Sequence, residues 1–414
     1  MDTVSQKLDE VLHALAYEKI EGVASDVDSD PLLARLKTLG SEVWVDTGEL
    51  EKAQGIWKQE MTALTTNNTL ANQVVQSGIM DQVIEDTIKK IREEGLELSD
   101  EELILEVGFV INCKIALRLV QAFKVKVSVE LHPGISKNIS RTLHYGKRYF
   151  KVCPEFFIVK VPLTPEGYLA VRKLTRENIP INFTLGFSSR QNYLAARLSN
   201  PQFVNVFLGR LNQIVIEHNA GTGDKVGEKV ALATQNALIE AREKFDEVQS
   251  RLIGASIRNA EQIAFLAGLD VLTIPPKAIK EFQESGKPCD QVVSHLKKEI
   301  IPGIDSNHPL SKRFPSLWEI TNQFISFVDA LMSQESLDEM QGDMLVEFCN
   351  NYGIDLFHNF SEAEFKKIYD HGKIPCLDNW PESIALDDLM TQSALQSFTK
   401  DQNALDDRIR SFLK

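Results

Sequence analysis

Lys160 is the residue whose surroundings most strongly suggest chemistry. It interrupts an apolar strand pattern, FFIVKVP, at residues 156–162. Apolar surroundings disfavour the charged ammonium, and the uncharged amine is the form that attacks a ketone to give a Schiff base. The alternative is a lysine that points outward from an edge strand and extends its ammonium into solvent. The pattern predicts a nucleophilic lysine if other polar groups gather around it.

Two carboxylates end other apolar strand patterns. Asp46 ends VWVD, and Glu130 ends VKVSVE. Schiff-base chemistry requires proton transfers when the carbinolamine forms, when it loses water and when a C–C bond breaks, so two positioned acids or bases are expected. Each carboxylate also has a structural interpretation. Asp46 precedes the sequence TGEL and would cap a helix, and Glu130 precedes a turn at HPG, residues 132–134.

Other polar residues follow strand patterns in a way that suits a phosphorylated ligand. Arg210 follows the sixth strand, and Ser256 and Arg258 open a helical pattern. Backbone N–H groups at the start of a helix favour an anion, and the loops after strands seven and eight of a (β/α)8 barrel often hold phosphate. The remaining polar residues at strand ends are Asn67, Asn182, Thr184 and Asn205.

Short runs rich in Val, Ile and Phe alternate with longer helical patterns from about residue 42 onward. The strand candidates are 43–46, 61–66, 125–130, 156–161, 180–185, 203–208, 251–255 and 270–274. This alternation, without a hairpin signal, indicates a parallel sheet. Eight strands, with no GxGxxG after the first, favour a closed (β/α)8 TIM barrel over an open sheet. The active site of such a barrel lies at the C-terminal ends of its strands.

The chain on either side of the barrel is predicted to be helical. Residues 1–40 form an N-terminal helical extension that begins with an amphipathic helix over 1–22, and residues 41–284 form the barrel. Residues 285–384 form a helical insertion or elaboration with helices at 290–299, 316–333, 335–352 and 361–370. Residues 385–414 form a C-terminal helix that packs on the barrel through Leu395, Phe398, Leu405, Ile409 and Phe412.

Composition excludes several classes of function. The 414 residues carry 45 Lys and Arg against 59 Asp and Glu, a net charge of −14, which disfavours nucleic acid and anionic membrane surfaces as partners. No apolar run reaches the ~20 residues of a membrane span, and the N-terminus lacks a signal-peptide core. The five cysteines are scattered along the chain, which favours a reducing compartment. The eight histidines do not have the spacing of metal ligands, so no metal site is expected. We therefore expect a cytoplasmic protein.

Several segments together resemble transaldolases, which are class I, Schiff-base-forming aldolases. The segments are WVDTGELEKA, ALTTNNTL, VKVSVE, FIVKVPLTPEG, INFTLGFS, FVNVFLGRLN and LIGASIRNAEQIAFLAGLDVLTIPPKAI, in the order of the family. The strings KVPLTPEG, which begins at Lys160, and GASIRN, at residues 254–259, are the most specific. The resemblance runs from about residue 41 to 284 and returns at the C-terminal helix.

The resemblance implies a reaction of the pentose phosphate pathway. A dihydroxyacetone unit would pass from sedoheptulose 7-phosphate or fructose 6-phosphate to glyceraldehyde 3-phosphate or erythrose 4-phosphate through a Schiff base on Lys160. Asp46 would take the proton of the C4 hydroxyl, while Glu130 would act through a water, helped by Thr184. No metal or organic cofactor would be required, because the protonated imine is itself the electron sink.

By the same resemblance, the rest of the predicted site binds substrate. Its members would hold hydroxyl groups at one end and a phosphate at the other. They are Asn67 and Asn182 for the hydroxyl groups, Arg210, Ser256 and Arg258 for the phosphate, and Asn205 and Phe207 as further substrate-binding residues. The oligomeric state is open, with a homodimer as one alternative.

Two other functions remain as alternatives. A fructose-6-phosphate-type aldolase would release dihydroxyacetone, but such enzymes tend to have Gln in place of Glu130 and Tyr in place of Phe207. A catalytically weak homologue would use its added helices to bind or regulate a partner. It is suggested by three departures from the family pattern: Asn68 replaces a proline, Ala63 an aspartate found in some members, and Asn205 a serine.

Overall fold

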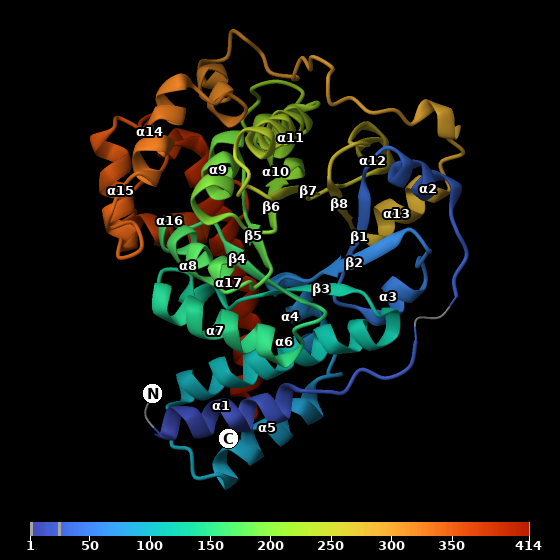
Figure 1. Cartoon of the computed structure of the whole chain (residues 1–414), viewed down its shortest axis with the longest axis vertical. Helices are drawn as coiled ribbons and strands as arrows, with labels where there is room; N and C mark the ends of the chain where they lie inside the picture. Colours follow the sequence, from blue (N-terminus) through green and yellow to red (C-terminus); the bar gives the residue numbers. More distant parts are fainter. Residues whose placement is uncertain (1–2, 24–25, 414) are drawn as a thin grey trace.

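Eight parallel strands close into a barrel at the centre of the molecule (Figure 1). The structure, a computed structural model, describes residues 3–23 and 26–413. The strands follow one another around the barrel in sequence order: β1 (Glu42–Asp46), β2 (Met61–Thr65), β3 (Lys126–Glu130), β4 (Phe157–Pro162), β5 (Ile181–Thr184), β6 (Phe203–Phe207), β7 (Arg251–Ala255) and β8 (Val271–Ile274). Each strand overlaps its predicted range, which confirms the predicted (β/α)8 barrel.

Strand pairing brings polar residues of neighbouring strands side by side. Glu130 on β3 pairs with Lys160 on β4, and Lys160 in turn pairs with Asn182 on β5. On the two preceding strands, Asp46 on β1 pairs with Thr65 on β2, and β2 pairs with β3. Paired residues project from the same face of a sheet, so each set enters the barrel interior together.

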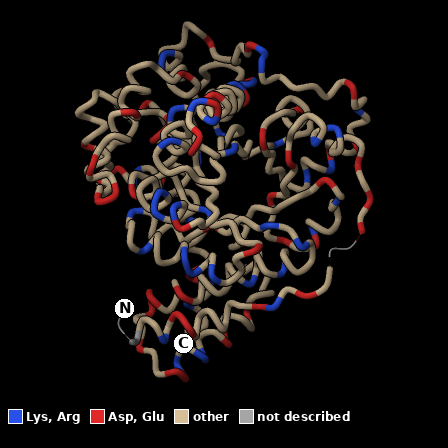
Figure 2. The backbone as a smooth tube through the Cα atoms, viewed as in Figure 1, with Lys and Arg blue, Asp and Glu red and all other residues tan. Residues whose placement is uncertain are grey.

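The barrel strands carry six charged residues, in two groups. Glu42, Lys126 and Arg251 are the first residues of their strands, and Arg251 pairs with Glu42 at 2.7 Å. Asp46, Glu130 and Lys160 lie at or near the opposite, C-terminal ends. Elsewhere, charges of both signs follow the helices and loops around the barrel (Figure 2). Charged residues are seldom fully buried, so the group at the C-terminal ends requires a functional explanation.

Helices cover the outside of the barrel. They are α2 (Pro31–Thr38), α3 (Leu50–Gln54), α4 (Asn68–Gln76), α5 (Asp81–Glu93), α6 (Asp100–Phe123), α7 (Ile139–Val152), α8 (Pro165–Arg176), α9 (Ser189–Leu194), α10 (Leu208–Glu217), α11 (Val226–Lys244), α12 (Ala260–Phe265) and α13 (Pro276–Gln283). The helical patterns of the sequence lie at 49–58, 69–94, 100–122, 136–149, 165–177, 188–198, 228–248 and 258–267, so α2, α10 and α13 were not predicted as separate helices. The start of α10 is hidden in the sequence because the helix follows β6 directly, without a loop or a side-chain cap.

The remaining helices lie beside the barrel. Helix α1 (Thr3–Ala16) packs against α5, α6 and α7, and residues 1–2 of its predicted range lie outside the described residues. Helices α14 (Asn322–Met332), α15 (Gly342–Asn351) and α16 (Glu362–His371) precede the long α17 (Leu386–Arg410), which packs on α4, α6 and α16. The division of the chain at residues 40, 284 and 384 stays a prediction. Within residues 3–23 and 26–413, no helix is long and apolar enough to cross a membrane.

The helix predicted for residues 290–299 is wrong. A short turn at Cys289–Gln291 is followed by irregular chain. Side chains of the outer helices bind its backbone carbonyls: Arg35 donates to the carbonyl of Val292 at 3.0 Å, and Asn236 to that of Leu296 at 2.9 Å. The buried Val292 side chain anchors the segment, so tertiary contacts override the local helical pattern. The helices predicted for 316–333 and 335–352 also begin later, with α14 and α15.

Candidate active site

A cavity of about 180 Å³ opens at the C-terminal ends of the strands, where the active site of this fold is expected. Its lining includes Asp46, Asn67, Lys160, Asn182, Asn205, Phe207, Arg210 and Ser256, all predicted from the sequence, together with Thr65, Thr69, Leu70, Ile253, Ala255, Thr273 and Phe398. Of the remaining predicted residues, Glu130 lies beside Lys160, while Thr184 and Arg258 stand outside the lining. The structure thus brings most of the predicted set into one cavity.

Lys160 projects into the cavity from β4 and is only 4% exposed. Its Nζ lies 3.1 Å from Oε2 of Glu130 and donates a hydrogen bond to the backbone carbonyl of Thr66 at 3.2 Å. The alternative interpretation, in which this lysine points outward into solvent, is therefore wrong. Its immediate strand neighbours, Val159 and Val161, are buried on the other face, so the apolar surroundings seen in the sequence do not surround the amine.

The two carboxylates lie near Lys160; Glu130 is buried and Asp46 is partly buried. Burial raises the pKa of Asp46 and of Glu130, and the positive charge of Lys160 opposes that rise in both. Asp46 also accepts a hydrogen bond from the Thr65 hydroxyl at 2.6 Å, and that hydroxyl lies 2.6 Å from the hydroxyl of Thr273. The raised pKa values bring two carboxyl groups closer to the neutral range, where they exchange protons more readily.

Neither carboxylate caps a helix. The residue that precedes α3 is Glu49, three positions after Asp46, and its side chain makes no capping bond. In the turn after Glu130, it is His132 that accepts the hydrogen bond from the backbone of Gly134. The structural interpretations of Asp46 and Glu130 are thus wrong. Neither carboxylate is occupied by a helix cap, so both can act at the C-terminal end of the barrel, where the cavity opens.

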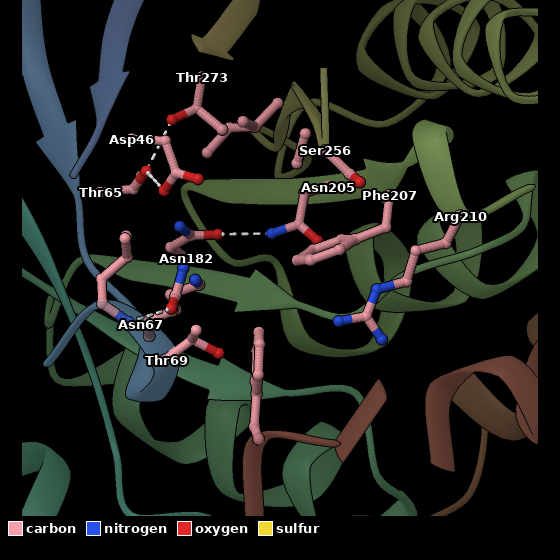
Figure 3. Close-up of a pocket in the computed structure, with 15 residues that line it drawn as sticks. Asp46, Thr65, Asn67, Thr69, Asn182, Asn205, Phe207, Arg210, Ser256 and Thr273 are labelled. Atoms are coloured by element: carbon pink, nitrogen blue, oxygen red, sulfur yellow. Dashed lines mark hydrogen bonds between the residues drawn. The ribbon is translucent and has the colours of Figure 1, made fainter. Parts of the chain in front are cut away.

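A chain of side-chain hydrogen bonds joins β3, β5 and β6 inside the barrel. Asn205 donates to the amide oxygen of Asn182 at 2.9 Å, and Asn182 donates to the hydroxyl of Ser128 at 3.0 Å. Figure 3 shows this pair of asparagines between Asp46 and Arg210. The amide oxygen of Asn205 and the hydroxyl of Thr184 have no hydrogen-bond partner among the described residues. The cavity therefore offers Asn205 as an acceptor for a ligand hydroxyl.

The far end of the cavity is positively charged. Arg210, the third residue of α10, lines this end together with Ser256, which lies in the turn after β7 and adopts a left-handed backbone with φ +62°. Gly209 allows the close approach of the two segments, because a Cβ there would lie 2.3 Å from the carbonyl oxygen of Ser256. Burial and the charge of nearby Arg258 lower the pKa of Arg210 to about 10. An anion would relieve both effects.

Four polar or aromatic lining residues were missed in the sequence. Thr65 and Thr273 are on the interior face of β2 and β8, where strand alternation places them, and Thr69 follows the predicted Asn67 by two positions. Asn67 itself caps α4 by accepting from the backbone of Leu70 at 2.9 Å. Phe398 was predicted only as part of the apolar face of the C-terminal helix, and no local signal shows that this face reaches the cavity.

Comparison with known proteins places the chain in a family. Residues 43–314, which are 272 of 414, match the family described as transaldolase/fructose-6-phosphate aldolase. Relatives named transaldolase include one from Chlamydia pneumoniae, 26% identical over 74% of this chain and 90% of its own length. Another, from Kluyveromyces lactis, is 28% identical over 63% of this chain and 78% of its own length. The match covers all eight strands apart from the first residue of β1, and the whole cavity wall except Phe398, and the chain is a member of the transaldolase/fructose-6-phosphate aldolase family.

Proposed function

We propose that the protein is a transaldolase that carries a dihydroxyacetone unit on Lys160 as a Schiff base. The observation that supports this best is the buried contact of Lys160 with Glu130, in a cavity that also holds Asp46 and ends at Arg210. One cavity, with Glu130 beside its lysine, thus combines a nucleophile, two nearby proton-transfer groups and an anion subsite. The reaction belongs to the pentose phosphate pathway of the cytoplasm, with sugar phosphates as substrates.

The proposed reaction begins when the Lys160 amine attacks the C2 carbonyl of a ketose phosphate. Glu130, 3.1 Å from the amine, assists the proton transfers of carbinolamine formation and loss of water through an intervening water, helped by Thr184. The Asp46 carboxylate then accepts the C4 hydroxyl proton while the C3–C4 electrons move into the imine. An aldose phosphate leaves, and an enamine remains on the lysine.

The second half of the reaction reverses these steps with another aldehyde. The enamine carbon adds to the carbonyl of glyceraldehyde 3-phosphate or erythrose 4-phosphate, and Asp46 returns the proton to the new hydroxyl. Hydrolysis of the imine then frees the product ketose and Lys160. Substrate hydroxyls bind Asn67, Asn182 and Asn205 beside Phe207, while Arg210, Ser256 and Arg258 hold the phosphate.

Borohydride trapping tests the Schiff base. The protein is incubated with fructose 6-phosphate, reduced, digested and analysed by mass spectrometry. We expect a reduced dihydroxyacetone adduct on the peptide that contains Lys160, and a Lys160→Met variant should fold and form none. If the folded wild type forms no adduct, the proposal fails and the binding or regulatory alternative replaces it.

A second assay separates transfer from release of dihydroxyacetone. With fructose 6-phosphate and erythrose 4-phosphate, we expect continuous formation of sedoheptulose 7-phosphate and glyceraldehyde 3-phosphate. Without an acceptor, the reaction should stop after about one turnover, because the enamine waits for an aldehyde. Glu130 and Phe207 favour this outcome over the aldolase alternative. Steady release of free dihydroxyacetone at the catalytic rate would instead identify an aldolase.

A further inference from the structure

Arg210 differs from the other buried arginines of the chain. Arg148, Arg190 and Arg197 each form an ion pair with at least one carboxylate. Arg210 is 8% exposed and has no carboxylate within ion-pair distance among residues 3–23 and 26–413, and its Nη1 has no hydrogen-bond partner in the same residues. A buried guanidinium without a carboxylate needs other contacts to hold it in place.

Two aromatic rings supply those contacts. The Cζ atom of Arg210 lies 5.9 Å from the ring centroid of Phe207 and 5.7 Å from that of Phe398. A cation within about 6 Å of a ring centroid is attracted by the electrons of the ring. Phe207 is the last residue of β6, three positions before the arginine, whereas Phe398 comes from α17, nearly two hundred residues later. The C-terminal helix therefore supplies half of the contacts that fix this guanidinium.

Helix α17 is itself held at the cavity by two hydrogen bonds to the first turn of α4. Asn68 donates to the side-chain oxygen of Gln402 at 2.9 Å, and the Thr69 hydroxyl donates to Asp401. Thr69 and Phe398 both line the cavity. Residues 398, 401 and 402 share one face of the helix because they are three or four positions apart. The same face therefore both docks α17 on α4 and presents Phe398 to Arg210.

We propose that Phe398 is a positioning residue, which holds Arg210 in the orientation that binds the substrate phosphate. Arg258 repels Arg210 while Asp401 and Glu130 attract it, but no carboxylate of the described residues lies within ion-pair distance, so the two rings are the contacts that hold the guanidinium at the anion subsite. With the ring in place, a phosphate meets a donor that is already oriented and loses less conformational entropy on binding. The proposal rests on the proposed function only for the identity of the phosphate ligand.

Inorganic phosphate serves as the probe, because its binding can be measured without turnover. Titration calorimetry compares the wild type with Phe398→Leu, which keeps an apolar side chain but removes the ring. We expect phosphate to bind about three- to tenfold more weakly to the variant. Phe412→Leu is the matched control, since Phe412 also faces an arginine, Arg408, at 5.2 Å but lies away from the cavity. Its phosphate affinity should equal that of the wild type.

A double-variant comparison separates positioning from general packing. In an Arg210→Gln background, Phe398→Leu should change phosphate affinity no further, because the group that it positions is gone. A ring at position 398 with increasing fluorination keeps the shape of phenylalanine but weakens its attraction for a cation, so affinity should fall stepwise with fluorine content. This series also stays informative if the leucine variant does not fold. Unchanged affinity throughout the series would overturn the proposal.

The kinetic constants KM and kcat distinguish a positioning role of Phe398 from a purely structural one. For Phe398→Leu we expect a raised KM for glyceraldehyde 3-phosphate, with kcat and the KM for unphosphorylated glyceraldehyde unchanged. Equal losses with both acceptors would show that the ring only supports packing. If the wild type binds phosphate through Arg210 and Phe398 but transfers no dihydroxyacetone, the proposed reaction fails while the positioning role stands.

Discussion

Glu130→Gln tests the proposed proton transfers most directly. The change keeps the size of the side chain but removes the negative charge 3.1 Å from Nζ of Lys160. A positioned general acid or base contributes about 10²- to 10⁴-fold to the rate, and an amide cannot replace it. We therefore expect kcat to fall by about 10²- to 10⁴-fold, with slow formation of the borohydride-trapped adduct on Lys160 retained.

The same substitution breaks a buried ion pair, which gives a second magnitude. Two unit charges 3.1 Å apart interact by about 5 kcal/mol at an effective dielectric constant of about 20. Desolvation opposes this attraction, and burial raises the pKa of Glu130 in spite of the lysine. The attraction to Lys160 thus only partly compensates for burying the carboxylate. We therefore expect the free energy of unfolding to fall by about 3 kcal/mol, at the low end of the range for removing one partner of a buried ion pair.

Glu106→Gln is the matched control for Glu130→Gln. Glu106 is also buried and accepts hydrogen bonds from Arg148 at 2.7 Å and from Tyr145 at 2.9 Å, away from the cavity. We expect urea denaturation to show a comparable loss of stability for both variants, and stopped or coupled assays to show a loss of kcat only for Glu130→Gln. The reasoning is refuted if Glu130→Gln turns over like the wild type, or if the control loses as much activity.

Three further predictions concern pH and packing. The raised pKa of both site carboxylates predicts that kcat falls on the acid side at a pH above the usual carboxyl range of about 4, which a pH–rate profile measures. Gly209→Ala should weaken phosphate binding and lower stability by about 1–3 kcal/mol because its Cβ meets the carbonyl of Ser256, whereas Gly108→Ala has room. Burial raises the pKa of Asp388 to about 7. The protonated carboxyl therefore contributes to the stability of the folded protein, and this contribution is fully present below about pH 4 and is lost as the pH rises to about 7. Asp388→Asn should therefore equal the wild type in urea unfolding near pH 4 and exceed it by up to about 4 kcal/mol at pH 8.

The barrel and the centre of its site could be predicted because their signals are local. Each strand is a short apolar run, and parallel strands bring their C-terminal ends to one place. Asp46, Glu130 and Lys160 lie on three different strands, yet each stands at or near the end of its own run, so their convergence follows from the fold alone. The same reasoning predicted Asn182 and Asn205, which the structure joins by a hydrogen bond.

The rest of the site could not be predicted because it depends on packing between distant segments. Phe398 looks like any core residue of an amphipathic helix, and only the path of α17 across α4 carries it to Arg210. Thr184 ends a strand as predicted, but its hydroxyl lies outside the cavity lining. The irregular chain at residues 290–299 is likewise fixed by side chains from elsewhere, which a local pattern cannot show.

Two departures from the family pattern have a physical explanation in these contacts. Asn205, in place of a serine, is long enough to reach Asn182 and complete the chain of hydrogen bonds that joins β3, β5 and β6. Asn68 stands at the first position of α4, where the proline of the family pattern would suit the backbone. A proline, however, would leave the side-chain oxygen of the fully buried Gln402 without its hydrogen-bond donor, which costs about 1–3 kcal/mol. The gain in stability from a proline, which restricts the unfolded chain, is only about 0.4–1 kcal/mol. The balance favours asparagine only while α17 brings Gln402 to this point, so this substitution and the docking of α17, which carries Phe398, depend on each other.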